Sequence, residues 1–140
     1  MTDPLWSPTK QKILNSNMHQ LQKSLNIQFN LNLSNYSDLH SWSVNNLKDF
    51  WKYIWYDTKI KYSKNFDTII DNEKKMPGAK WFSGSKLNFA ENLLRIKNNN
   101  IAIEFYGEDK IKSSLTYAEL HSLVSKVSYS LKKIGLNKGD

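Results

Sequence analysis

The side chains that most often carry out chemistry in proteins are scattered in this sequence. The three histidines, His19, His40 and His121, lie far apart and beside no carboxylate cluster at the spacing of a metal site. Adjacent carboxylates occur at Glu108-Asp109, where shared exposure favours a solvated turn over acid–base catalysis. Cysteine is absent and the five glycines are isolated, which excludes thiolate chemistry and a glycine-rich phosphate loop. We therefore predict no catalytic, cofactor-binding or metal-binding residue in this chain.

Tryptophan side chains could bind a ligand by stacking. Trp42, Trp51 and Trp55 each offer a large flat face to a base or a sugar. Trp51 and Trp55, however, fall on the same helical stripe as Leu47 and Ile54, and such a stripe usually faces a core. We predict that Trp51 and Trp55 are core residues.

A second polar cluster comprises Asn88, Glu91 and Asn92. Asn88 is placed to accept hydrogen bonds from first-turn amides, and Glu91 to reach back to the Asn88 amide. Polar residues at a helix start are more typical of a cap than of a ligand site, so we expect a helix here with Phe89, Leu93, Leu94 and Ile96 facing inward.

The net charge of +7 could indicate binding to nucleic acid or to an acidic membrane. The cations are almost all lysines spread from Lys10 to Lys138, with a single arginine, Arg95, which favours a solvated surface. No apolar run reaches the roughly 18 to 20 residues of a membrane span, and the first residues lack a signal-peptide pattern. We expect a soluble, cytoplasmic protein with no nucleic-acid or membrane partner.

The first half of the chain reads as mostly helical. Ser7-Pro8 and apolar residues at steps of three and four predict an amphipathic helix over about residues 8 to 25. Alternating apolar residues predict an extended segment over residues 27 to 35. Ser37 is expected to cap one short helix, and Asn46 to begin another. Met76-Pro77-Gly78 predicts a type II turn.

After residue 100 the pattern changes to strands. Ile101 to Tyr106 and Ile111 to Leu115, separated by a turn at Gly107 to Lys110, predict a β-hairpin. Thr116 and Glu119 form a capping box that begins a helix, and Gly135 is suited to end it. The apolar stripe of this helix comprises Leu120, Leu123, Val124, Val127, Leu131 and Ile134. A hairpin and one helix leave such faces poorly covered, so we expect that the chain is cut off after Asp140.

One long segment resembles a known family. Met76 to Leu94, read as MPGAKWFSGSKLNFAENLL, is similar to the segment that opens the acetoacetyl-CoA synthetase branch of the AMP-forming acyl-CoA synthetases. Shorter matches follow in the same order over nearly the whole chain, including Leu115 to Leu120 and Gly139-Asp140. The sequence departs from the pattern in a conservative way: Lys80, Ser83, Lys86 and Phe89 stand where arginine, proline, arginine and tyrosine are common.

The resemblance implies an α+β fragment. Residues 1–96 would be the mostly helical N-terminal region, and residues 97–140 the β-hairpin and helix that begin a larger α/β adenylate-forming, AMP-binding domain. It implies a ligase that uses ATP, CoA and Mg²⁺ and acts on acetoacetate. The family's phosphate-binding loop and catalytic lysine would lie beyond Asp140, so we expect this fragment to bind no cofactor, to be inactive alone and to pack on the missing large domain.

Three alternatives stay open. The chain could be a fragment of an acetyl- or propionyl-CoA synthetase, a self-contained noncatalytic interaction module that presents its aromatic helices, or a basic nucleic-acid-binding domain. The segment Ala90 to Leu94 favours the acetoacetyl-CoA branch, because acetyl-CoA synthetases carry a different sequence there.

Overall fold

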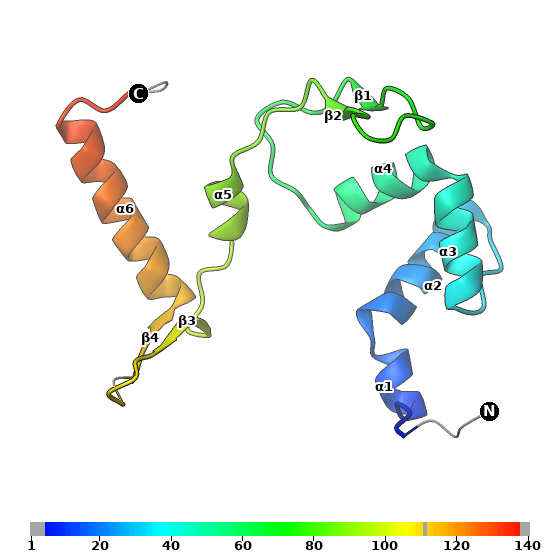
Figure 1. Cartoon of the computed structure of the whole chain (residues 1–140), viewed down its shortest axis with the longest axis horizontal. Coiled ribbons are helices and arrows are strands. Elements are labelled where there is room, and N and C mark those ends of the chain that lie inside the picture. The colour runs from blue at the N-terminus through cyan, green and yellow to red at the C-terminus, as the bar shows by residue number, and fades with distance from the viewer. Residues whose placement is uncertain (1–4, 111, 138–140) are drawn as a thin grey trace. The chain divides into compact units, whose positions relative to one another are not determined.

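A computed structural model describes residues 5–110 and 112–137. The chain divides into two compact units, which are described separately (Figure 1). Unit 1 comprises the residues up to Thr58 together with Ile69–Trp81, and unit 2 comprises Lys59–Thr68 and the residues from Phe82 onward. The described residues form six helices and four strands, and the predicted helical region followed by a hairpin and a helix is confirmed.

Unit 1 begins with two helices where one was predicted. Helix α1 spans Lys10–Leu14 and α2 spans Asn17–Phe29. Between them, the Ser16 hydroxyl accepts a hydrogen bond from the His19 amide at 3.1 Å and donates one to the Ile13 carbonyl at 2.7 Å. A serine that satisfies backbone groups on both sides ends one helix and caps the next.

The extended segment predicted over residues 27 to 35 is wrong in its first third. Helix α2 continues to Phe29 and ends at Asn30, whose φ of 51° places it in the left-handed region. The Asn26 carboxamide then binds both backbone groups of Leu33, each at 2.9 Å. This clamp satisfies the backbone of the loop that follows the helix.

Helices α3, Tyr36–Asn45, and α4, Leu47–Asp57, follow one another closely. The cap of α3 is Asn35, which accepts from the Asp38 amide at 3.0 Å, and not Ser37 as predicted. Asn46 begins α4 as predicted, but its carboxamide donates to the Trp42 carbonyl at 3.0 Å instead of capping α4. Asn46 therefore closes one helix with its side chain and starts the other with its backbone.

The buried hydrophobic residues of the described chain all belong to unit 1. They are Leu25, Leu39, Trp55 and Ile70. They come from α2, α3, α4 and strand β1, Thr68–Ile70. A short loop then leads to β2, Trp81–Ser83, which pairs with β1. The predicted turn lies in this loop, where Gly78 has a φ of 96° and the Met76–Pro77 peptide bond is cis.

Unit 2 contains helix α5, Phe89–Leu93, and the predicted hairpin. Strand β3, Ile101–Tyr106, pairs antiparallel with β4, Lys112–Thr116, with a register shift between Ile101 and Ile103. Ile111, assigned to the second strand from the sequence, lies outside the described residues. The inward face predicted for α5 is wrong: Phe89 is 79% exposed and Leu93 is also exposed. Because α5 is only five residues long, the other described residues cover only part of its surface.

Helix α6, Tyr117–Lys133, has both ends satisfied by its own residues. The predicted capping box is confirmed, with the Glu119 carboxylate accepting from the Thr116 amide at 2.8 Å. At the other end Gly135 has a φ of 99°, its amide binds the Lys132 carbonyl at 3.1 Å, and the Leu136 amide binds the Leu131 carbonyl at 3.1 Å. These two bonds make a Schellman motif, which satisfies two terminal carbonyls.

Candidate functional site

The histidines singled out in the sequence are not brought together. His19 lies on α2 and His40 on α3, where the His40 ring stacks on Tyr36 with centroids 6.0 Å apart, while His121 lies on α6 in unit 2. In the part of the chain that the structure describes, no group of three histidine, cysteine or acidic side chains could hold a metal ion. Glu108 and Asp109 lie exposed in the hairpin turn, as predicted.

The rings of Trp42 and Trp51 meet other aromatic rings at tilted or edge-to-face angles and do not form a stacked platform. The Trp42 ring lies 5.0 Å from Phe29 at an interplanar angle of 52°. Trp55 is buried, which confirms the prediction, but Trp51 is 37% exposed and packs edge-on against Trp81 with centroids 5.6 Å apart. The prediction that Trp51 is a core residue is therefore wrong, because its ring on α4 is exposed.

Asn88 caps α5 as predicted, but the described residues show no return bond from the Asn88 amide to Glu91, and Asn92 ties two segments together. Asn88 accepts from the Glu91 amide at 3.0 Å. Asn92 accepts from the Lys61 amide at 2.8 Å and donates to the Lys61 carbonyl at 2.9 Å. This two-bond clamp joins positions 31 residues apart and had no signal in the sequence.

The same segment is fixed again a few residues earlier. The Lys86 amide donates to the Lys64 carbonyl at 2.9 Å, and the Asp67 amide donates to the Ser83 carbonyl at 2.8 Å. Gly84 has a φ of 84°, and a side chain there would overlap the Asp67 carboxylate. Glycine is therefore required at this position by both backbone conformation and space. The stretch that carries the family resemblance thus acts as a scaffold for residues 61–67.

A polar hollow of about 350 Å³ brings three of the predicted candidates together in unit 2. Its lining includes Asn88, Glu91 and His121, together with Lys61 and Ser125. The Ser125 hydroxyl donates to the His121 carbonyl at 2.8 Å, one turn back on α6. Because that hydroxyl is directed to the backbone and Asn88 is occupied in capping α5, these groups stabilise helices and are not arranged as a nucleophile and its base.

Three carboxylates have lowered pKa values, and each has a structural cause. The Ser34 hydroxyl lowers the pKa of Asp38, the Lys80 backbone amide lowers that of Asp71, and the Thr116 backbone amide lowers that of Glu119. Hydrogen bonds to the charged form favour ionisation. Asp38 and Glu119 lie in the first turns of α3 and α6, and Asp71 lies in the bend after β1, so none of these shifts marks a catalytic acid.

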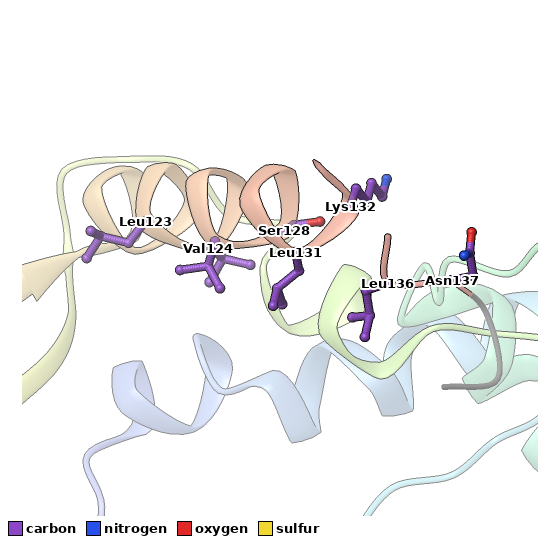
Figure 2. Close-up of a pocket in the computed structure, with 8 residues that line it drawn as sticks. Leu123, Val124, Ser128, Leu131, Lys132, Leu136 and Asn137 are labelled. Atoms are coloured by element: carbon purple, nitrogen blue, oxygen red, sulfur yellow. The ribbon is translucent and has the colours of Figure 1, made fainter. Parts of the chain in front are cut away.

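A large, mainly apolar hollow lies along α6 (Figure 2). It measures about 790 Å³ and its lining includes Leu123, Val127, Leu131 and Leu136. Figure 2 shows the Val124 and Leu131 side chains on the same side of the helix, with Lys132 near its C-terminal end. The polar members of the lining are Ser128, Lys132 and Asn137, and a wide surface that is mainly apolar suits packing better than chemistry.

None of the described helices is long and apolar enough to cross a lipid bilayer.

Comparison with known proteins confirms the predicted resemblance. Residues 36–93 match the family described as acetyl-coenzyme A synthetase N-terminus. The chain is 36% identical to acetoacetyl-CoA synthetase of Xenopus tropicalis over 140 residues, covering 97% of this chain and 20% of that protein. It is 34% identical to acetoacetyl-coenzyme A synthetase of Rhizobium meliloti (strain 1021) over 137 residues, covering 98% of this chain and 21% of that protein.

A solved structure agrees with these sequence matches. The acetoacetyl-CoA synthetase from Streptomyces lividans superposes with a TM-score of 0.83 at 29% identity, over 99% of this chain and 22% of that one. The chain thus spans about one fifth of the length of the curated relatives that it matches. It corresponds to their N-terminal part.

Proposed function

We propose that the chain is the N-terminal part of an ATP-dependent acetoacetate–CoA ligase, which converts acetoacetate, ATP and CoA to acetoacetyl-CoA, AMP and diphosphate. The observation that carries this proposal is similarity to acetoacetyl-CoA synthetases over 97% of the chain, from animals to bacteria. ATP and CoA are the co-substrates that such an activity needs. The described residues offer no cluster that fits Mg²⁺, so we assign no step and no residue to the metal.

The role of this part would be structural. We propose that residues 1–96 form the helical N-terminal region and that residues 97–140 begin the AMP-binding domain. The clamp of Asn92 on Lys61 and the contact of Asp67 with Gly84 support this role, because they fix loops without exposing a reactive group. In a complete ligase, the exposed stripe of α6 would pack against the remainder of the polypeptide, and we place that enzyme in the cytoplasm.

The reading frame downstream of codon 140 provides the first test. We expect it to continue into an apolar strand and later into a loop rich in threonine, serine and glycine. The encoded polypeptide should then release diphosphate when ATP and acetoacetate are both present, faster than with acetate or propionate. Preference for acetate or propionate would contradict the substrate assignment, and an in-frame stop would favour a noncatalytic interaction module.

The 140-residue chain itself should release no diphosphate above a buffer control in the presence of ATP and acetoacetate. Release that depends on both substrates would show that a catalytic site lies within these residues and would contradict the structural role. The longer polypeptide, assayed in parallel, is the positive control.

A further inference from the structure

A second hollow, of about 440 Å³, is lined by the C-terminal end of α2 and by one face of α4. The aromatic and charged members of its lining are Phe29, Asp49, Lys52, Tyr53, Tyr56 and Asp57. The five members from α4 follow one another at steps of three, one, three and one, which is the spacing of a single helix face. The whole lining therefore belongs to unit 1.

Three of the lining side chains are aromatic, and two of these rings meet at an angle. The centroids of the Phe29 and Tyr53 rings lie 6.2 Å apart, with the ring planes inclined at 61°. Tyr53 is half-buried, and Tyr56, one turn along α4, is 48% exposed. The face of an aromatic ring carries partial negative charge, so a hollow lined by several rings attracts a cation.

The charge around this hollow is negative, although the chain as a whole carries a net charge of +7. Two aspartates, Asp49 and Asp57, and one lysine, Lys52, give the lining a net charge of −1. Helix α2 ends at Phe29 and α4 at Asp57, and neither helix has a basic residue in its last turn. A helix C-terminus is the negative end of the helix dipole, so both ends favour a cation nearby.

A hydrogen bond joins the aromatic and the acidic parts of the lining. The Tyr53 hydroxyl donates to Oδ1 of Asp57 at 3.2 Å, one turn along α4. A phenol that donates to a carboxylate is polarised, which makes its ring more attractive to a cation. Within the described part of the chain, no ion pair joins either aspartate to Lys52, so both carboxylates are available to an incoming ion.

We propose that this hollow binds a small organic ammonium ion of the quaternary type, with its methyl groups against the rings and its charge near Asp49 and Asp57. A quaternary nitrogen has no N–H group that needs a hydrogen-bond partner, so aromatic walls suit it. The volume of the hollow lies within the roughly 300–1,000 Å³ of small-molecule sites. The proposal is independent of the ligase assignment, because it rests on the lining in unit 1.

Titration of the full chain with choline chloride, followed by nuclear magnetic resonance, tests whether the ion binds. We expect saturable shifts of the ring resonances of Phe29, Tyr53 and Tyr56, with a dissociation constant of about a millimolar, because so small an ion makes few contacts. Sodium chloride at equal ionic strength is the control for salt. Shifts that do not saturate, or that sodium chloride reproduces, would overturn the proposal.

A neutral ligand tests the part played by the charge. The carbon analogue of choline, in which carbon replaces the quaternary nitrogen, has the same shape without the charge. It should bind at least roughly tenfold more weakly than choline, because a neutral group gains little from ring faces and carboxylates. Equal affinity for the two ligands would show an ordinary apolar hollow and would refute the proposal.

Removing one carboxylate tests the acidic side of the lining. Asp49→Asn should raise the dissociation constant for choline by about three- to tenfold. The matched control is Asp109→Asn, which removes the same charge from the exposed hairpin turn of unit 2 and should leave the dissociation constant unchanged. Equal weakening by the two variants would show that choline responds only to net charge, which contradicts a site at α4.

Lys52 supplies a test in the opposite direction. Lys52→Met removes the positive charge of the lining and keeps an apolar chain, so it should lower the dissociation constant by roughly two- to fivefold. Lys10→Met, outside the lining, is the control and should have no effect. Weaker binding by Lys52→Met would contradict the proposed site.

The aromatic wall is tested at Tyr53. Tyr53→Leu should raise the dissociation constant by roughly tenfold or more, whereas Tyr53→Phe keeps the ring, loses only the bond to Asp57 and should have the smaller effect. Circular dichroism would show whether both variants keep their helices. If Tyr53→Leu unfolds, the Asp49 and Lys52 variants still decide the question. A folded Tyr53→Leu chain that binds choline as tightly as the natural chain would refute the proposal.

Discussion

Replacing Trp55 with alanine should be among the most damaging single changes in unit 1. Trp55 is 4% exposed and shares the core with Leu25 and Leu39. A tryptophan side chain buries about 150–250 Å², and at about 25 cal/mol per Å² that transfer is worth about 4–6 kcal/mol. Measured losses for tryptophan to alanine in cores are about 3–5 kcal/mol, and we expect Trp55→Ala to fall in that range.

Trp51 provides a matched comparison on the same helix. It is 37% exposed and one of its contacts is the edge of Trp81, which can move toward solvent when the ring is removed. We expect Trp51→Ala to cost about 2 kcal/mol, because a site near the surface relaxes more fully than a core site. The difference between the losses of unfolding free energy in the two variants tests whether α4 buries one face, and neither value alone does so.

Urea unfolding followed by far-ultraviolet circular dichroism measures both changes, and the methyl resonances of Leu25 and Leu39 report on unit 1 alone. Domains of this size are stable by about 5–15 kcal/mol, so Trp55→Ala could leave unit 1 unfolded. Trp55→Phe, which keeps a ring in the core, is the fallback and should cost less than Trp55→Ala. A loss for Trp55→Ala below about 1 kcal/mol, or below that for Trp51→Ala, would refute the assignment of the core.

Two further changes test the loops of the segment that resembles the ligases. The pKa of Asp71 lies below the usual value because the Lys80 amide donates to its carboxylate. The ionised carboxylate therefore stabilises the folded state above about pH 4, and this contribution is lost as the pH falls through the lowered pKa. The Lys80 amide resonance should titrate in that acidic window and should not do so in Asp71→Asn, whereas titration at or above the usual aspartate pKa would contradict the contact. Gly84→Ala should destabilise the chain by more than Gly135→Ala, because both glycines have positive φ but only Gly84 lies against the Asp67 carboxylate. Equal losses of unfolding free energy in urea would show that the Asp67 contact adds nothing.

The elements that the sequence predicts correctly are those whose signals lie within a few residues. The capping box of Thr116 and Glu119 and the glycine that ends α6 act within one helical turn, so residue types at fixed offsets reveal them. The β3–β4 hairpin is likewise a contact between neighbouring segments. Local chemistry alone determines these features, and the structure reproduces them.

The predictions that fail depend on contacts between distant residues or on competition between two local choices. Phe29 alternates with polar neighbours as a strand residue would, yet its ring packs on Trp42, and this contact favours continuing α2. Ser16 could lie inside a helix by propensity, but its hydroxyl satisfies backbone groups on both sides and divides α1 from α2. The partner of Phe29, Trp42, lies at no fixed offset, so no spacing rule predicts that contact. The partners of Ser16 lie three residues away on either side, and there the prediction fails because a cap competes with a place inside a helix.

The candidate site divides in the same way. Asn88 is identifiable as a cap from its neighbours, whereas the clamp of Asn92 on Lys61 spans 31 residues and is visible only in the fold. The hollow that gathers Glu91 and His121 is also invisible in the sequence, since α5 and α6 are separated by the whole hairpin.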